Sequence, residues 1–213
     1  LLNVAVEAPD GEKILMGSEA KFAPGMKLLI DAAATGPLEK IEIRSGKKIL
    51  KTIFPEESIP CTGKRVKVVW SGAEVKGRAR MTVWDGTLSL TGNTIEHFDG
   101  INFWNPEKGI ERRSDRSLAW ASITTGSDAG CVLILEKPGE GNLEVNTRQK
   151  SVSVPVQSLK REAAIWDCGG LRKELSVYCL PDAEGPTEWS GSVNLENLTE
   201  AVNPIYVKII QED

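Results

Sequence analysis

The chain has 213 residues, of which 40% are hydrophobic and 26% are charged, so it can bury a normal core as one large or two small domains. Its net charge of −4 argues against a general nucleic-acid binder, whose binding surface would be basic. No apolar run is long enough to span a bilayer, and the first residues lack the basic and apolar regions of a signal peptide. We therefore expect a globular chain without a nucleic-acid or membrane partner. The compartment stays open, with the cytoplasm slightly favoured.

Short β-branched runs that end at Gly, Pro, Asn or Asp predict strands in the first part of the chain. These expected strands are Leu2–Val6, Met26–Ala33, Ile41–Arg44 and Lys48–Phe54. The stretch Ala8–Gly25 is rich in glycine and is expected to be a loop. Pro55–Gly63, with two prolines and two acids, is the candidate internal boundary, and a crossover within one sandwich is an equal alternative.

The clearest strand pattern lies between Arg65 and Gly86, where two runs alternate with period two. On the first run, one face carries Val66, Val68 and Trp70. On the second run, one face carries Ala79, Met81 and Val83, and the other carries Arg78, Arg80, Thr82 and Trp84. Asp85-Gly86 then predicts a type I′ turn, in which both central residues have positive φ.

The remaining apolar runs continue the same pattern to the end of the chain. They predict strands at Thr87–Leu90, Thr94–Phe98, Ile101–Trp104, Leu118–Thr124, Cys131–Leu135, Leu143–Asn146, Ser151–Val156, Leu171–Leu180 and Ile205–Ile210. The Cys131–Leu135 run is apolar on both faces, which is typical of a strand covered on each side. Only Pro155–Ala164 has weak helical potential. The fold class predicted for residues 1–213 is an all-β, antiparallel β-sandwich with many short strands and little or no helix.

The cysteines are Cys61, Cys131, Cys168 and Cys179, and no two of them have CxxC spacing. Cys131 and Cys179 lie in apolar runs and are expected to be small core residues. We expect free thiols, with disulfides as the alternative. Since structural zinc needs four ligands, usually in close pairs, no metal site is expected in this chain.

His97 is the only histidine and therefore the only candidate base for nucleophilic catalysis. Alternation places it on the same side as Asp99, which could orient it. No nucleophile motif accompanies it, so an ordinary surface histidine is the favoured interpretation. Two further stretches, Thr124–Gly130 (TTGSDAG) and the cluster of Arg112, Arg113 and Arg116, are expected to be a plain loop and solvated side chains rather than anion sites.

Six tryptophans are the other conspicuous residues. Trp84 with Arg78 and Arg80 is the best group for stacking on a sugar ring or holding an anion. The alternative, which we favour, is that these rings close the sandwich core or pack under arginine stems.

Several stretches together resemble a known family. They are VKVVWSGAEVKGRARMTVWDG (Val66–Gly86), INFWNPEKGI (Ile101–Ile110), WASITTGSDAG (Trp120–Gly130), NPIYVKIIQED (Asn203–Asp213), MGSE (Met16–Glu19) and PLEKIEIRSG (Pro37–Gly46). The chain is similar, over nearly its whole length, to the carboxy-terminal part of a large family of uncharacterised bacterial proteins. That family is related to the PHP (polymerase and histidinol phosphatase) metal-dependent hydrolases.

The resemblance implies that the catalytic site lies in a different domain from this chain. In such proteins a divalent metal site lies in an amino-terminal PHP-like domain built from several His and acidic residues. This chain has one His, so none of those ligands can be assigned here, and no catalytic residue or cofactor is expected in it. The chain would then be a module of a larger protein, and its metal would belong to the missing domain.

The first hypothesis is therefore a non-catalytic accessory β-domain that packs on the catalytic domain of the same polypeptide, shapes its substrate cleft, or drives homo-oligomerisation. The candidate contact residues are Arg78, Arg80, Trp84, Trp104 and Asn105. The second hypothesis is a carbohydrate-binding or adhesive β-sandwich, which predicts tryptophan rings exposed in a line. The third is a self-sufficient hydrolase that uses His97.

Overall fold

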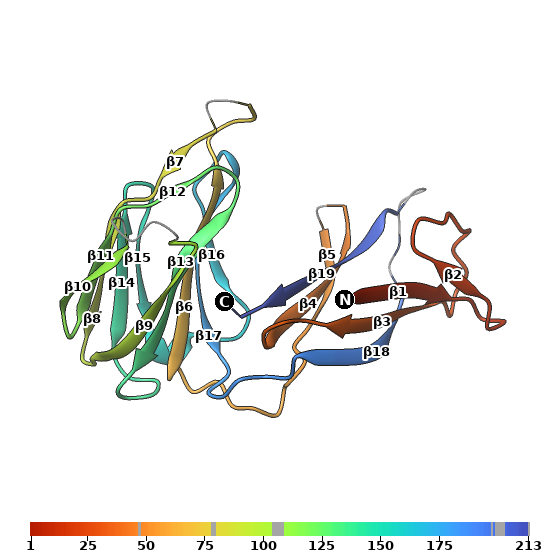
Figure 1. The fold of residues 1–213 in the computed structure, drawn as a ribbon, viewed down its shortest axis with the longest axis horizontal. Helices are drawn as coiled ribbons and strands as arrows, with labels where there is room; N and C mark the ends of the chain where they lie inside the picture. Colours follow the sequence, from red (N-terminus) through yellow and green to blue (C-terminus); the bar gives the residue numbers. More distant parts are fainter. Residues whose placement is uncertain (47, 78–79, 104–108, 197, 199–202, 213) are drawn as a thin grey trace. The chain divides into compact units, whose positions relative to one another are not determined.

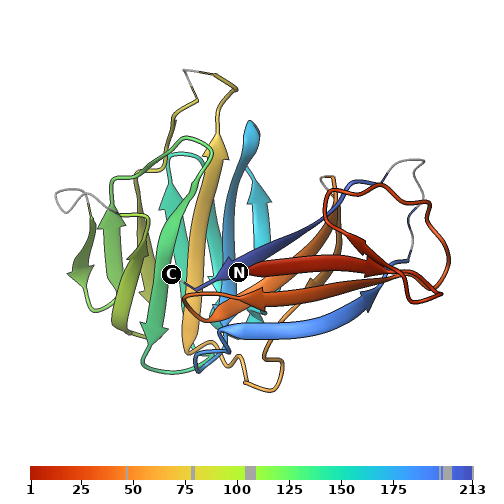
Figure 2. The same ribbon diagram turned by 45° about the vertical axis from the view of Figure 1, so that its right-hand side comes forward.

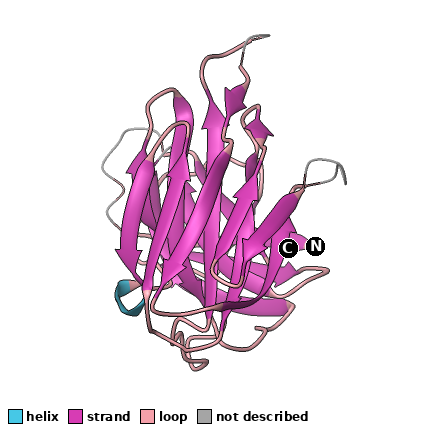
Figure 3. Cartoon of the chain, turned by 90° about the vertical axis from the view of Figure 1, so that its left-hand side faces the viewer, coloured by secondary structure: helices cyan, strands magenta, loops and turns pink. Residues whose placement is uncertain are grey.

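The computed structural model describes residues 1–46, 48–77, 80–103, 109–196, 198 and 203–212. In these residues the regular structure is almost entirely strand, and every strand pair is antiparallel. One short 3-10 turn, Val156–Ser158, lies within the stretch that has weak helical potential (Figure 3). The predicted all-β sandwich class is confirmed. Among the described residues, no helix has the length and apolar character to cross a membrane.

The chain divides into two compact units. Unit 1 combines Leu1–Ile59 with Ala183–Asp213, and unit 2 is Pro60–Asp182. Unit 2 is therefore inserted in the sequence of unit 1. The division between Ile59 and Pro60 falls inside the predicted boundary segment Pro55–Gly63. The division between Asp182 and Ala183 was not predicted from the sequence.

Unit 1 contains two sheets. Their strand orders are β18-β3-β1-β2 and β19-β4-β5 (Figures 1 and 2). The strands are β1 (Leu2–Glu7), β2 (Lys13–Leu15), β3 (Lys27–Ala33), β4 (Leu38–Ser45), β5 (Lys48–Ile53), β18 (Glu188–Asn194) and β19 (Ile205–Gln211). Alternation puts Leu28, Ile30 and Ala32 of β3 inside, where they form one core with Ile41 and Ile43 of β4.

Unit 2 contains two five-stranded sheets and a two-stranded ribbon. The sheet orders are β10-β11-β8-β14-β15 and β16-β17-β6-β13-β9, and the ribbon pairs β12 with β7 (Figure 1). The strands are β6 (Arg65–Ala73), β7 (Thr82–Val83), β8 (Gly86–Thr91), β9 (Ile95–Ile101), β10 (Ile110–Ser114), β11 (Ser117–Trp120), β12 (Ile123–Thr124), β13 (Asp128–Leu135), β14 (Asn142–Thr147), β15 (Ser151–Pro155), β16 (Ala164–Asp167) and β17 (Leu171–Leu180).

The core of unit 2 follows the sequence pattern closely. Val66, Val68 and Trp70 of β6 are fully buried, as their shared face predicts. β13 pairs with β6 on one side and β9 on the other, and Val132 belongs to a second apolar cluster on its opposite face. The prediction that the Cys131–Leu135 run is covered on both faces is therefore correct.

The second run of the Arg65–Gly86 stretch differs from its prediction. Its described strand is only β7, which pairs with β12, and β8 begins directly at Gly86. Neither Asp85 nor Gly86 has a positive φ, so the predicted type I′ turn is wrong. The glycine serves close packing instead, because a Cβ there would lie 2.5 Å from the carbonyl oxygen of Asn146 and 2.9 Å from the Trp120 ring.

Four strands were not predicted, namely β2, β10, β16 and β18. All four lie at the edge of their sheet. Edge strands carry more polar and charged side chains, which protect them from pairing with other chains. β10, with the sequence IERRS, shows why hydrophobic alternation did not reveal them.

A disulfide joins Cys61 to Cys179, with the two Cα atoms 6.0 Å apart. The expectation of free thiols is therefore wrong for this pair, although it holds for Cys131 and Cys168. The two bonded residues are separated by 118 positions, and they lie near the two ends of unit 2. The cross-link therefore closes nearly the whole inserted unit into a loop.

We expect the double variant Cys61→Ser, Cys179→Ser to lower the free energy of unfolding by about 2–5 kcal/mol, because the open chain gains entropy when it unfolds. Denaturant unfolding without reductant measures this change. The control is Cys168→Ser, which removes a half-buried free thiol and should cost less than about 1 kcal/mol. Titration of four thiols in the unreduced, unfolded protein would contradict the cross-link.

The free thiols should also be slow to react in the folded state. Burial raises the pKa of the Cys131 thiol to about 12, and burial is also the main cause of a raised pKa at Cys168. A raised pKa lowers the thiolate fraction at neutral pH, and the thiolate is the reactive form. We expect iodoacetamide at about pH 8 to modify Cys168 slowly and Cys131 only after unfolding, as measured by peptide mass. Rapid modification of Cys131 in the folded protein would contradict its burial.

Candidate functional site

A hydrogen-bonded tryptophan cluster lies beneath the β7–β12 ribbon of unit 2. The Trp84 Nε1 atom donates to Thr124 Oγ1 over 2.9 Å, and Trp70 Nε1 donates to Ser122 Oγ over 2.9 Å. Trp120 Nε1 donates to the carbonyl of Trp84 over 2.7 Å, and its ring stacks on Trp70 with centroids 4.6 Å apart. All three indole N–H groups are thus satisfied inside the core.

These bonds decide which way the ribbon faces. Ser122 and Thr124 both point into the core because each accepts an indole N–H. Alternation therefore forces Ile123, between them, to point outward. Ile123 lies opposite Val83 and Thr124 lies opposite Thr82, so Val83 shares the outer face and Thr82 the buried one.

The outer face of the ribbon is an exposed apolar strip, which we call the ribbon strip and define as Met81, Val83 and Ile123. Met81 is 53% exposed and Ile123 is 52% exposed, while Val83 is half-buried. Large apolar side chains held outward on a rigid base are typical of surfaces that bind another protein. The ribbon strip is the described feature that best suits a contact role.

The predicted contact residues are distributed differently. Arg80 is exposed and directly precedes Met81. Trp84 is fully buried, so its ring cannot stack on a ligand. The favoured interpretation of Trp84 as a core residue is therefore correct. The other three candidates, Arg78, Trp104 and Asn105, lie outside the described residues.

Sequence reasoning found the alternation of this run and favoured a core position for Trp84 over a ligand-binding one. Trp84 was also named as a contact candidate because it shares its expected face with Arg78 and Arg80. The structure buries Thr82 and Trp84, as the favoured interpretation expects, and exposes Arg80 and Met81. The available signal was the size of the indole, whose burial stabilises the fold more than burial of a methionine does.

The tryptophans give no support to a sugar-binding face. Trp70, Trp84 and Trp120 are buried, and Trp166 and Trp189 are half-buried against the two cores. Among the five described tryptophans none is exposed, so the described part of the chain has no line of exposed rings.

His97 does not lie in a catalytic arrangement. Its Nε2 atom is 3.2 Å from Asp99 Oδ1, and both side chains are well exposed on β9. Within the described ranges, no hydroxyl or thiol is hydrogen-bonded to the ring. This geometry matches the favoured interpretation of a surface histidine.

The arginine cluster is exposed, and one of its three members also connects two strands. Arg112 donates to the carbonyls of Ile95 over 2.7 Å and Glu96 over 3.1 Å, and its guanidinium lies 5.3 Å from the centroid of the Phe98 ring. Arg113 and Arg116 are exposed and pair with neighbouring acids. Arg112 thus ties β10 to β9 while it stays exposed, and all three arginines are solvated as expected.

The TTGSDAG stretch runs from the last residue of β12 into β13, and only residues 125–127 form the loop that was expected over the whole stretch. Gly126 donates its N–H to the carbonyl of Gly72 over 3.0 Å, and Gly72 donates to the carbonyl of Ser127 over 3.3 Å. The Gly126 amide is therefore already engaged and is not directed at an anion.

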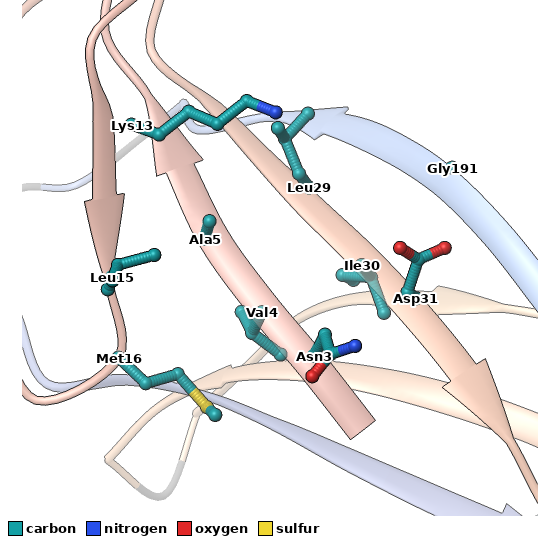
Figure 4. A pocket seen from close by; sticks show the side chains of 10 residues that line it. All are labelled: Asn3, Val4, Ala5, Lys13, Leu15, Met16, Leu29, Ile30, Asp31 and Gly191. Carbon is teal, nitrogen blue, oxygen red and sulfur yellow. The ribbon is translucent and has the colours of Figure 1, made fainter. Parts of the chain in front are cut away.

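A shallow hollow of about 490 Å³ lies on the outer face of the β18-β3-β1-β2 sheet (Figure 4). Ala5 and Leu29 form its floor, and the exposed side chains of Leu15 and Met16 lie along one side. Asn3, Asp31 and Lys13 supply its polar groups, and Asp31 accepts a hydrogen bond from Ser190. No group of three or more His, Cys, Asp or Glu side chains suited to a metal ion occurs in the described residues.

Comparison with protein-family models, with curated proteins and with solved structures found no match for this chain. The similarity to PHP-related proteins therefore remains a sequence-based expectation.

The hydrogen bonds of Thr124 should contribute measurably to stability. Its Oγ1 accepts from Trp84 and donates to the Gly72 carbonyl over 2.7 Å, so Thr124→Val leaves a buried indole N–H unpaired. We expect a loss of about 1–3 kcal/mol in the free energy of unfolding.

Thr82→Val is the matched control, because Thr82 is also buried and lies opposite Thr124. Among the described residues, the Thr82 hydroxyl has no hydrogen-bond partner, so this change should be neutral or stabilising. Equal losses for both variants in denaturant unfolding would show that the Trp84 bond contributes nothing.

Proposed function

We propose that this chain is a non-catalytic accessory β-module of a PHP-like metal-dependent hydrolase. It packs on the catalytic domain of the same polypeptide and helps to shape the substrate cleft there. The divalent metal is held by that catalytic domain and not by this chain. The assignment of the partner rests on the sequence resemblance described above.

The observation that carries the docking role is the ribbon strip on its rigid base. Met81 and Ile123 expose apolar surface, yet the ribbon beneath them is fixed through Thr124 to the buried Trp84. A face that is already ordered loses little conformational entropy when it binds. Arg80, directly beside Met81 and exposed, can supply a polar contact at the rim.

Methionine oxidation provides a direct test, because Met81 is exposed in this chain and a docked domain would cover it. We expect hydrogen peroxide to oxidise Met81 readily in the 213-residue chain and at least about tenfold more slowly in the natural gene product. Peptide mass spectrometry measures both rates. In the natural product, Ile123→Asp should restore rapid oxidation, since a buried charge disrupts an apolar interface.

The other two methionines are internal controls. Met16 is exposed in unit 1, outside the ribbon strip, and should oxidise in both proteins, whereas Met26 is buried and should resist in both. The intact mass of the natural product should also be far above 23.2 kDa. A natural product of about this mass, or equal Met81 oxidation in a longer one, would overturn the proposal.

A further inference from the structure

The free edge of β7, which carries part of the ribbon strip, is covered by a side chain from the β14–β15 turn. The Trp84 N–H donates to the Ser122 carbonyl over 2.7 Å, so Trp84 directs its backbone groups to the β12 side. Because antiparallel pairs alternate, Val83 directs its carbonyl away from β12. The Nε2 group of Gln149 donates to this carbonyl over 2.9 Å. Gln149 therefore bonds to β7 where a neighbouring strand would otherwise lie.

Other residues of the turn bond to the same part of the chain. Arg148 donates its N–H to the Asp85 carbonyl over 3.1 Å, and its guanidinium lies 3.2 Å from the Asp85 carboxylate. The Gln149 N–H donates to Thr147 Oγ1 over 3.2 Å, which holds the turn itself. Together with the Gln149 side chain, these contacts join the β14–β15 turn to the chain on both sides of Trp84.

The Gln149 side chain is in turn held by a buried lysine of β17. The Nζ atom of Lys173 donates to Gln149 Oε1 over 3.3 Å and to Glu74 Oε1 over 2.8 Å. The Lys173 side chain is 9% exposed and that of Glu74 is 44% exposed. A buried ammonium needs a counter-charge and hydrogen-bond acceptors, which Glu74 and Gln149 supply. Lys173 thus joins the β17 side of the sandwich to the β14–β15 turn of the other sheet.

The two partners determine how the Gln149 amide is oriented. A carbonyl only accepts and an ammonium only donates, so the amide NH2 group faces Val83 and the amide oxygen faces Lys173. A glutamate at this position could still accept from Lys173, but its carboxylate could not donate to Val83. A continuous set of bonds therefore joins Lys173 to the ribbon strip through Gln149.

A β-bulge in β17 directs Lys173 to this place. The pairing of β17 with β6 is irregular here, and Arg172 has a φ of +52°. Positive φ is unfavourable for arginine and persists only where the surroundings hold it. The Arg172 carbonyl accepts from the Ser71 hydroxyl over 3.1 Å, and a Cβ on Gly72 would lie only 2.2 Å from the same oxygen. β6 thus holds the bulge, and bulges redirect the side chains beside them.

We propose that Lys173 and Gln149 are positioning residues for the ribbon strip. Thr124 fixes the ribbon from beneath, and Gln149 fixes its free edge. Lys173 acts through Gln149 and needs no contact with a partner. A strip that is held at both places keeps one arrangement and loses less conformational entropy when it binds. This inference rests on the proposed docking role of the ribbon strip, because positioning affects binding only at a surface that binds.

Hydrogen exchange in the 213-residue chain tests the anchoring without any partner. Gln149→Glu keeps an acceptor for Lys173 and removes the donor to Val83. Lys173→Met removes the ammonium and keeps an unbranched apolar stem. We expect both variants to speed exchange of the Trp84 N–H at least about tenfold, since the ribbon then opens without unfolding of the whole unit. The amides of β14 should exchange as before.

Lys150→Met is the matched control. Lys150 is exposed and lies next to Gln149 in the same turn, so this variant removes a charge without touching the bonds of the Gln149 side chain. It should leave exchange at Trp84 unchanged. Denaturant unfolding of the variants shows whether faster exchange is local. Gln149 lies in a turn and is only half-buried, so Gln149→Glu decides the question if Lys173→Met does not fold.

Oxidation of Met81 in the natural gene product gives the second readout. A docked partner should slow this oxidation at least about tenfold relative to the 213-residue chain. We expect Gln149→Glu and Lys173→Met to reduce that protection to less than about threefold, because a mobile strip binds more weakly. Lys150→Met should preserve the full protection.

The possible failures can be told apart. Equal exchange at Trp84 in Gln149→Glu and Lys150→Met would overturn the inference. Full protection of Met81 in both positioning variants would also overturn it and would leave the docking proposal standing. Equal oxidation of Met81 in the unaltered natural product and in the 213-residue chain would overturn the docking proposal, and this inference with it.

Discussion

Three buried indole N–H groups need hydrogen-bond acceptors, and this need determines which side chains of the β7–β12 ribbon face outward. A buried donor without an acceptor is costly, so each indole requires a fixed partner. Two of these partners, Ser122 and Thr124, lie two residues apart on one short segment. That spacing turns both hydroxyls inward and leaves Ile123 outward. The outward direction of the ribbon strip is thus a consequence of the buried hydrogen bonds.

The two units differ in where their apolar side chains are exposed. Unit 2 has covered inner faces at its β15 edge, a disulfide between Cys61 and Cys179, and an apolar strip on its ribbon. Unit 1 has partly buried inner residues at both edges of its smaller sheet, on β5 and on β19. In both units, apolar side chains are thus left partly exposed at particular strands.

Strands inside the sheets could be predicted from sequence, because they bury one or both faces and the side chains on a buried face are apolar. β17 was predicted with its observed bounds, and β3 with its buried residues Leu28, Ile30 and Ala32. The edge strand β10 could not be found in this way, because four of its five residues are exposed. The disulfide was missed for another reason, since a separation of 118 residues leaves no local signal.

The sequence by itself determined the all-β class, the interior strands and their buried faces, because hydrophobic alternation is a local property of the chain. It also revealed the alternation of Met81, Val83 and their neighbours and favoured a core position for Trp84. Only the tertiary structure decided that the Trp84 indole meets Thr124, that Cys61 reaches Cys179 and that β19 stays at an edge. These features depend on contacts between segments distant in sequence, and a local pattern cannot specify which distant segments meet.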